Sequence, residues 1–275
     1  MKRACELCKV SRSGYYEWLR RPAKVKVDVL PQKVKRVFME SRKTYGTRRI
    51  KKKLAAEEIV WSRKRIRRIM AEQGLVAKAR CKTRAATDSN HNHPVAPNLQ
   101  GGRFDADYPN QVWVTDITYL KTREGWLYLA VVIDLYSRMV VGWSINNRMA
   151  KDLVINALEK AIKSRNPDPG LICYSDRGSQ YCSHAYQDLL KKHGFLCSMS
   201  RKGECLDNAV AESFFHSLKV EWIYGEPPVS KNEMYRSVRE YIEVFYNRQR
   251  LHSANGYLSP CDFERVNEST FLMSA

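Results

Sequence analysis

The feature that most constrains this sequence is an uneven distribution of charge. The 275 residues contain 48 Lys and Arg and 29 Asp and Glu, a formal net charge of +19. Residues 1–100 hold 27 of the cations and eight of the acids, whereas residues 101–275 hold 21 of each. The whole excess lies in the first third, which predicts a polyanion-binding segment joined to an electrically balanced body. Binding to a membrane surface and simple solubilisation are alternatives, but the scarcity of interleaved acids favours nucleic acid.

Length and composition favour a globular protein of one large or two modest domains. Hydrophobic residues make up 44% and charged residues 28%, which is enough apolar material for a core. The longest apolar run, Leu127–Ile133, is far shorter than the roughly 20 residues of a membrane helix. No signal peptide opens the chain, and the eight cysteines follow no repeating frame. We therefore expect a cytosolic protein with no membrane partner and with free thiols.

Residues 25–79 are predicted to form a small all-α helix-turn-helix domain. Thr47 is the expected N-cap of one helix, and Ser62 is the expected N-cap of a second, which Gly74 ends. Apolar residues around positions 34–38 indicate a third helix that covers the core of the other two.

The second helix of the pair is the expected recognition helix. It carries five basic side chains within six positions: Arg63, Lys64, Arg65, Arg67 and Arg68. Such a helix reaches phosphates and base edges in the major groove of DNA. An ordinary solvated helix face is the alternative, but five cations with no acid before Glu72 would repel one another without a polyanion.

The regions on either side of this domain are less informative. Residues 1–24 resemble the back half of another helical unit capped by Ser11, whose front half is missing or very short. Cys5 and Cys8 have zinc-like spacing, but no second Cys/His pair follows at the spacing of a zinc finger. Residues 80–102 have the composition of a linker.

Residues 103–267 are predicted to form an α/β catalytic core, followed by a tail over residues 268–275. The expected strands are Gln111–Leu120, Trp126–Tyr136, Met139–Asn147, Leu171–Ser175 and Phe195–Met199. The expected helices are Lys151–Ser164, Ser183–His193, about Asp207–Trp222 and about Lys231–Arg250. The order βββαβαβα is that of the ribonuclease H-like fold, a mixed sheet flanked by helices.

Three carboxylates in this body are candidates for chemistry. Asp116 lies inside the first strand, where an acid is costly unless it has a partner such as a metal ion. Asp176 follows the fourth strand in a glycine-containing loop, and Glu212 lies on the helix after the fifth strand. In the predicted fold the three converge, and two Mg²⁺ ions bound to them would serve phosphodiester chemistry. Asp134, Glu204 and Asp207 are competing acids that spacing and polarity alone do not exclude.

Three motifs and the C-terminal region resemble bacterial insertion-sequence transposases of the DDE, retroviral-integrase-like superfamily. The motifs are Trp113–Tyr119 (WVTDITY), Ser175–Tyr181 (SDRGSQY) and Asn208–Phe215 (NAVAESFF). The 35 residues between Asp176 and Glu212 match the family's spacing. The similarity is specifically to the catalytic second-reading-frame product of frameshifting elements.

This resemblance implies a function and a choice among the acids. It implies that Asp116, Asp176 and Glu212 bind Mg²⁺ or Mn²⁺, with two ions expected. It implies cleavage of DNA at element ends and transfer of the 3′-hydroxyl to another strand. The implied partners are double-stranded DNA of the terminal inverted repeats and of the target, further copies of this chain, and an upstream reading-frame product fused by frameshifting. A catalytically silent DNA-binding regulator is the alternative, and either protein would associate with the bacterial nucleoid.

Two further side chains are expected to contact DNA. Asn208, Glu212 and Lys219 are four and seven residues apart, so one face of a helix presents all three. The family has a basic residue at the position of Lys219, which would bind a phosphate of the element end as a point charge. A solvated surface lysine is the alternative.

Overall fold

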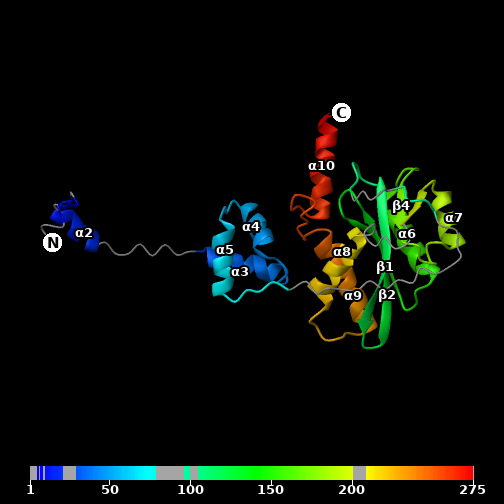
Figure 1. The fold of residues 1–275 in the computed structure, drawn as a ribbon, viewed down its shortest axis with the longest axis horizontal. Coiled ribbons are helices and arrows are strands. Elements are labelled where there is room, and N and C mark those ends of the chain that lie inside the picture. Colours follow the sequence, from blue (N-terminus) through cyan, green and yellow to red (C-terminus); the bar gives the residue numbers. More distant parts are fainter. Residues whose placement is uncertain are drawn as a thin grey trace.

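The computed structural model of the protein describes residues 5, 7, 8, 10–20, 29–78, 96–99, 105–200 and 209–274. Figure 1 shows an N-terminal helix, a small helical module and an α/β body in chain order. The first helix with described bounds is α2 (Arg12–Arg20), and the Ser11 hydroxyl accepts a hydrogen bond from the Gly14 amide at 3.0 Å. Ser11 therefore caps this helix as predicted, and most of the predicted linker lies outside the described residues.

The helical module consists of three helices around one apolar core. They are α3 (Leu30–Glu40), α4 (Thr47–Ala55) and α5 (Arg63–Glu72). Ser62 caps α5, because its hydroxyl accepts from the Arg65 amide at 3.3 Å, and Gly74 follows the helix with a φ of +62°. The prediction that Thr47 caps α4 was wrong. Gly46 is the N-cap in extended conformation, and Thr47 is already helical.

The body is built on a five-stranded mixed sheet of order β3-β2-β1-β4-β5. The strands are β1 (Val112–Thr122), β2 (Gly125–Asp134), β3 (Val140–Asn146), β4 (Ile172–Ser175) and β5 (Leu196–Met199). The first three pair antiparallel, whereas β4 and β5 run parallel to β1. This order confirms the predicted ribonuclease H-like α/β class, with the helix-turn-helix module before it.

Successive side chains of β1 point to opposite faces of the sheet, and apolar residues lie on both faces. Helices therefore cover both faces of the sheet. Trp113 packs with α6 (Lys151–Arg165) and α7 (His184–Lys192) in one core. Val114 belongs to the second core, with α8 (Ala209–Leu218) and α9 (Lys231–Arg239). Within the described residues, no helix is both long and apolar enough to cross a membrane.

Two predicted helices and the predicted tail differ from the observed structure. The helix expected to reach Trp222 becomes π-helical after Leu218, in η2 (Lys219–Ile223), and α9 continues into a second π-helical segment, η3 (Glu240–Tyr246). The predicted tail is instead the end of α10 (Pro260–Ser274). The Ser259 hydroxyl accepts from the Asp262 amide at 3.1 Å, so a serine cap that the sequence analysis overlooked begins this helix.

The helix-turn-helix module is attached to the body by polar contacts. The Tyr45 hydroxyl donates to the Gln249 carbonyl at 3.2 Å and accepts from the Leu251 amide at 2.8 Å. Arg49 on α4 lies 3.5 Å from a carboxylate oxygen of Glu221 on η2. Arg250 holds the same carboxylate through two hydrogen bonds of 2.7 Å. Since Glu221 and Arg250 are both buried, this pair is the fixed point on which α4 docks.

Gly142 on β3 offers a test of the packing between the sheet and α6. A Cβ at this position would collide with the Ala157 carbonyl oxygen and lie 2.7 Å from the Ala161 side chain. We expect Gly142→Ala to lower the free energy of unfolding by about 1–3 kcal/mol, because overpacking strains a close-packed interface. Denaturant unfolding measures this change. The control Lys163→Ala, on the exposed face of α6, should leave stability nearly unchanged, and an equal effect of both variants would contradict the packing argument.

Candidate active site and nucleic-acid interface

Asp116 and Asp176 lie side by side at the edge between two parallel strands. Val114 on β1 is in register with Tyr174 on β4, so Asp116 is level with Asp176, one residue beyond the end of β4. Neighbouring strands are about 4.8 Å apart, which brings the two carboxylates close together. The Ile117 amide donates to Oδ1 of Asp116 at 2.7 Å and fixes the orientation of this half-buried side chain.

The loop after β4 holds Asp176 in position through its glycine. The Gly178 amide donates to Oδ1 of Asp176 at 2.9 Å. A Cβ at residue 178 would lie 2.9 Å from that same oxygen and 3.1 Å from the Gln180 side chain. A side chain at position 178 would therefore press against the carboxylate, and glycine permits the tight turn.

The surroundings of Asp116 oppose its negative charge. Burial raises the pKa of Asp116 well above its ordinary value, and the negative charge of Asp176 raises this pKa further. Glu212 also raises it, while the hydrogen bond from Ile117 and the charge of Lys219 lower it. The charges of Asp176 and Glu212 thus both act on Asp116, which is the electrostatic pattern of a site that binds a cation.

Glu212 is the outermost of the three acids. It is exposed in the first turn of α8, which packs against β1, and partial burial raises its pKa. Among the side chains that the structure describes, no three His, Cys, Asp or Glu lie close enough together to hold one metal ion. The structure therefore brings Asp116 and Asp176 together, and the charge of Glu212 acts on Asp116. The convergence of all three acids on metal ions stays a prediction.

Lys219 lies close enough to the site for its charge to act on Asp116, and its predicted contact with DNA stays a prediction. Its ammonium is 4.7 Å from the centre of the Tyr119 ring. Burial lowers the pKa of Lys219, and the charge of Asp116 opposes this change. The neighbouring His216 has a buried Nε2 with no hydrogen-bond partner in the described part of the chain. Asn208, the other predicted contact, lies outside the described residues.

Asp134 has a structural role. It is fully buried, and the Arg165 guanidinium lies 3.3 Å from its carboxylate. The amides of Asn110 and Tyr136 donate to it at 2.8 and 2.9 Å. These partners offset part of the cost of burying its charge, although burial still raises its pKa, and they hold the end of β2 in place. The other competitors, Glu204 and Asp207, lie outside the described residues.

Tyr181 is a residue of the site that the sequence analysis missed. Its hydroxyl is 3.1 Å from the Thr115 hydroxyl, and its side chain is buried. Burial raises the pKa of the phenol well above its ordinary value, and Asp116 and Asp176 raise it further. Tyr181 therefore stays neutral beneath the two acids. Its place at the end of the motif that begins at Ser175 was the signal available in the sequence.

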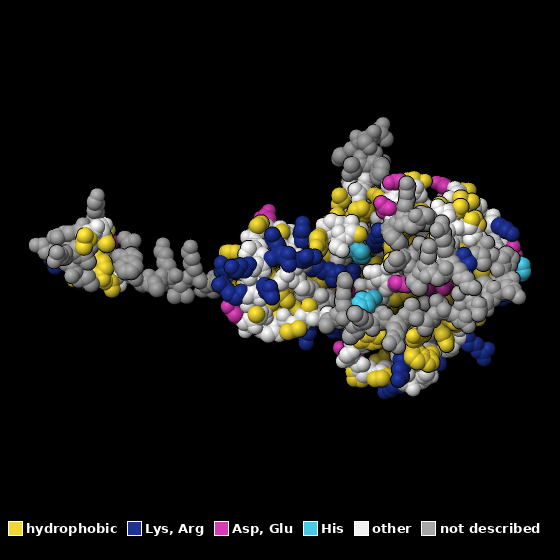
Figure 2. Space-filling model, in the orientation of Figure 1, with side chains coloured by type: hydrophobic (Ala, Val, Ile, Leu, Met, Phe, Trp, Pro, Cys, Tyr) yellow, Lys and Arg dark blue, Asp and Glu magenta, His cyan; other side chains and the backbone are white. Residues whose placement is uncertain are grey.

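The predicted recognition helix presents most of its cations to solvent. Arg63, Lys64, Arg67 and Arg68 are exposed on α5. Arg65 is half-buried, with its guanidinium 4.1 Å from the Trp61 ring, so packing on the tryptophan is part of its role. Figure 2 shows Lys and Arg side chains gathered over the helix-turn-helix module, so this described part of the basic third has a charged surface.

Comparisons with known proteins agree with the division into a helix-turn-helix module and an α/β body. Residues 106–205 and 212–267 each match a family described as an integrase core domain, and residues 26–83 match an HTH-like domain. Transposase InsF for insertion sequence IS3A of Escherichia coli (strain K12) is 44% identical, over 97% of this chain and 94% of its own. The chain belongs to this family of insertion-sequence transposases.

Two further relatives extend the comparison. A 31 kDa protein of insertion element IS600 from Shigella sonnei, described as uncharacterized, is 45% identical over 94% of this chain and 96% of its own. A chain of a simian T-cell lymphotropic virus intasome complex has a TM-score of 0.49 at 16% identity, over 74% of this chain and 67% of that chain. The family matches thus identify the chain as a transposase with an integrase core domain.

The electrostatic difference between Asp116 and Asp134 is measurable without any activity. At neutral pH a carboxylate with a raised pKa has a charge that opposes folding, and Asp116→Asn removes that charge. In EDTA, we expect Asp116→Asn to raise the melting temperature by a few degrees. Burial raises the pKa of Asp134 as well, but Asp134→Asn should lower the melting temperature, because Arg165 and the amides of Asn110 and Tyr136 then lose a charged partner. Thermal unfolding of both variants checks this, and equal shifts of the same sign would contradict the separate roles.

Proposed function

We propose that Asp116, Asp176 and Glu212 bind two divalent metal ions, Mg²⁺ or Mn²⁺, and that this transposase cuts DNA at the ends of its element. Bound ions of this kind activate an attacking hydroxyl and stabilise the leaving oxygen of a phosphodiester. The observation that supports the proposal is the pKa of Asp116, raised by burial and by the charges of Asp176 and Glu212. Oxygen donors with uncompensated negative charge are the ligands that Mg²⁺ prefers.

The chain's own groups would position the reaction. Ile117 and Gly178 orient the two aspartates through their amides, so each carboxylate has one oxygen engaged by the backbone. Lys219 would neutralise a phosphate next to the reacting one, because its ammonium lies within electrostatic reach of Asp116. The products are a free 3′-hydroxyl at the element end and, after transfer, a new bond to target DNA.

The proposed partners follow from the charged surfaces. The helix-turn-helix module would bind the terminal inverted repeat, and the body would bind both the repeat and the target DNA. Copies of this chain would assemble on the two element ends, and an upstream reading-frame product would join by frameshifting. These steps take place on DNA, so the protein would associate with the nucleoid.

Substitution of the acids tests the proposed chemistry. Asp116→Asn, Asp176→Asn and Glu212→Gln should each abolish cleavage and strand joining, because each removes a metal-binding charge, while DNA binding stays nearly unchanged. Asp188→Asn, an exposed acid on α7, is the matched control and should be fully active. Cleavage of a labelled element end in Mg²⁺ measures the effect. A catalytically silent DNA-binding regulator is the alternative, and a wild-type chain that binds ends without cutting them would support it.

Lys219→Ala tests the proposed phosphate contact. We expect slower cleavage of the element end with the fold and metal binding retained, because the variant removes one point charge beside the acids. Cleavage rates over a series of DNA-end concentrations measure this change. A variant that matches the wild-type rate at every concentration would show that Lys219 is a surface lysine without a role in the reaction.

The salt dependence of DNA binding tests the recognition helix. Each phosphate contact to duplex DNA contributes about 0.9 to the slope of log affinity against log salt. Changing Arg63, Arg67 and Arg68 together to alanine should flatten the slope by about that amount for each lost contact. The control changes Lys163, Lys191 and Lys192, which are exposed on α6 and α7. Fluorescence anisotropy without Mg²⁺ measures both slopes, and identical slopes would place the DNA contacts elsewhere.

A further inference from the structure

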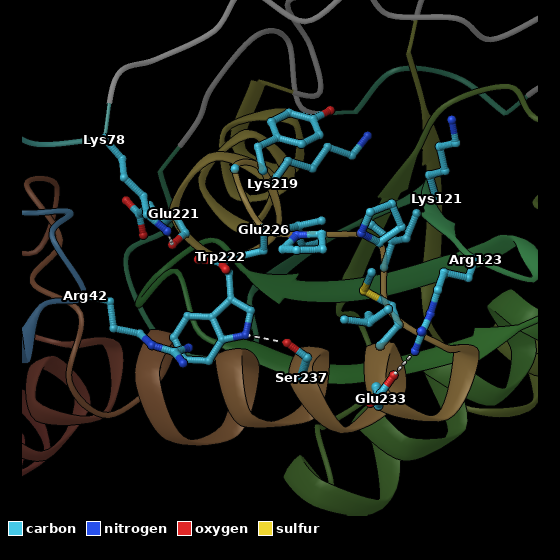
Figure 3. Close-up of a pocket in the computed structure, with 18 of the residues that line it drawn as sticks. Arg42, Lys78, Lys121, Arg123, Lys219, Glu221, Trp222, Glu226, Glu233 and Ser237 are labelled. Atoms are coloured by element: carbon cyan, nitrogen blue, oxygen red, sulfur yellow. Dashed lines mark hydrogen bonds and ion pairs between the residues drawn. The ribbon is translucent and has the colours of Figure 1, made fainter.

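A groove of about 1010 Å³ lies between the helix-turn-helix module and the body, outside the carboxylate site. Arg42 and Lys43, after α3, and Lys78, after α5, line it from the module. The hairpin of β1 and β2 and the segment from η2 to α9 line it from the body. Figure 3 shows side chains from these elements directed into the same space.

The charge of this groove is predominantly positive. Six Lys and Arg side chains line it, compared with three Glu. Two of the acids are engaged, because Glu221 binds Arg250 and Glu233 both caps α9 and pairs with Arg123. In contrast, no described carboxylate forms an ion pair with Lys43, Lys121 or Lys219, all of which line the groove. The available charge therefore favours an anionic occupant.

Two large aromatic side chains on the hairpin are exposed within the groove. Tyr119 is 43% exposed and Trp126 is 47% exposed, and their ring centres are 5.2 Å apart with an interplanar angle of 86°. They come from neighbouring strands, since Lys121 is the register partner of Trp126. Aromatic rings interleaved with lysines at solvent-accessible positions are the surface on which unpaired nucleotides stack.

The groove is continuous with the carboxylate site through Lys219. Its ammonium lies 4.7 Å from the Tyr119 ring, and its charge acts on Asp116. A DNA strand whose phosphate lies near Asp116 and Lys219 would therefore meet the aromatic hairpin with its neighbouring nucleotides. Duplex DNA keeps its bases stacked internally, so only nucleotides that have left the duplex would present a face to Trp126.

We propose that this groove binds unpaired nucleotides of the DNA strand that flanks the cleavage site, with a base stacked on Trp126 beside the perpendicular Tyr119 ring and the phosphates held by Lys43, Lys121 and Lys219. This inference rests on the proposed function, because it assumes that the DNA end lies at the carboxylates. It assigns recognition of single-stranded flanks to the β1–β2 hairpin, a surface separate from the recognition helix.

The experiment compares the binding of two DNA ends to the full-length chain in EDTA, where no cleavage occurs. One end is blunt, and the other has the same duplex with a short single-stranded flank. Wild type should bind the flanked end more tightly, and Trp126→Ala should remove most of that preference, roughly a tenfold loss by the usual strength of base–aromatic stacking. Tyr235→Ala is the matched control, since Tyr235 is 40% exposed and packs on Trp143 away from the groove.

A second measurement keeps the test decisive if Trp126→Ala unfolds. With 2-aminopurine in the flank, stacking on the groove should quench its fluorescence in wild type, and Lys121→Ala should weaken this quenching while Lys163→Ala does not. Equal affinity of wild type for blunt and flanked ends would overturn the inference, as would a preference or quenching that persists in the groove variants. None of these outcomes depends on cleavage. A failure of the groove proposal can therefore be distinguished from a failure of the proposed catalysis, which the cleavage assay measures.

Discussion

Repulsion between the Asp116 and Asp176 carboxylates is the constraint around which the body is organised. The parallel register of β1 and β4 brings these acids level with each other, and burial together with the charge of Asp176 makes the charge of Asp116 costly. The chain supplies partial compensation through the Ile117 and Gly178 amides and through Lys219. Holding the two acids together costs free energy of folding. A divalent ion that binds to both would offset this cost, and the repulsion therefore supports the proposed metal-binding function.

A buried ion pair in the body provides the site at which the helix-turn-helix module is attached. Glu221 lies two residues after Lys219 on η2 and accepts hydrogen bonds from Arg250, while Arg49 reaches it from the helix-turn-helix module. Breaking such a pair is strongly destabilising because one charge stays buried alone. The same π-helical segment therefore positions a lysine beside the acids and anchors the module that would hold DNA. This arrangement also creates the groove between the two parts.

Elements with strong local signals were predictable from the sequence, and those set by tertiary contacts were not. The β-rich segments at β1 and β2, the cap at Ser62 and the acid inside β1 predicted the strands, the recognition helix and Asp116. Family resemblance was needed to choose Asp176 and Glu212 among the acids, and the structure explains the rejection of Asp134 through Arg165. Periodicity did not predict the π-helical segments. The docking through Tyr45 depends on residues far apart in sequence, and the pairing of Tyr119 with Trp126 depends on the register of a hairpin, which periodicity does not reveal either.

The most direct test of the central claim is to count divalent ions on the protein bound to an element end. Titration with Mn²⁺, followed by electron paramagnetic resonance, should find two ions bound by the wild-type complex. Asp116→Asn and Asp176→Asn should each weaken or abolish this binding, whereas Asp188→Asn should leave it unchanged. Mn²⁺ binding by the Asp116→Asn complex that equals the wild type in number and affinity would contradict the account, because the carboxylates would then not be the metal ligands.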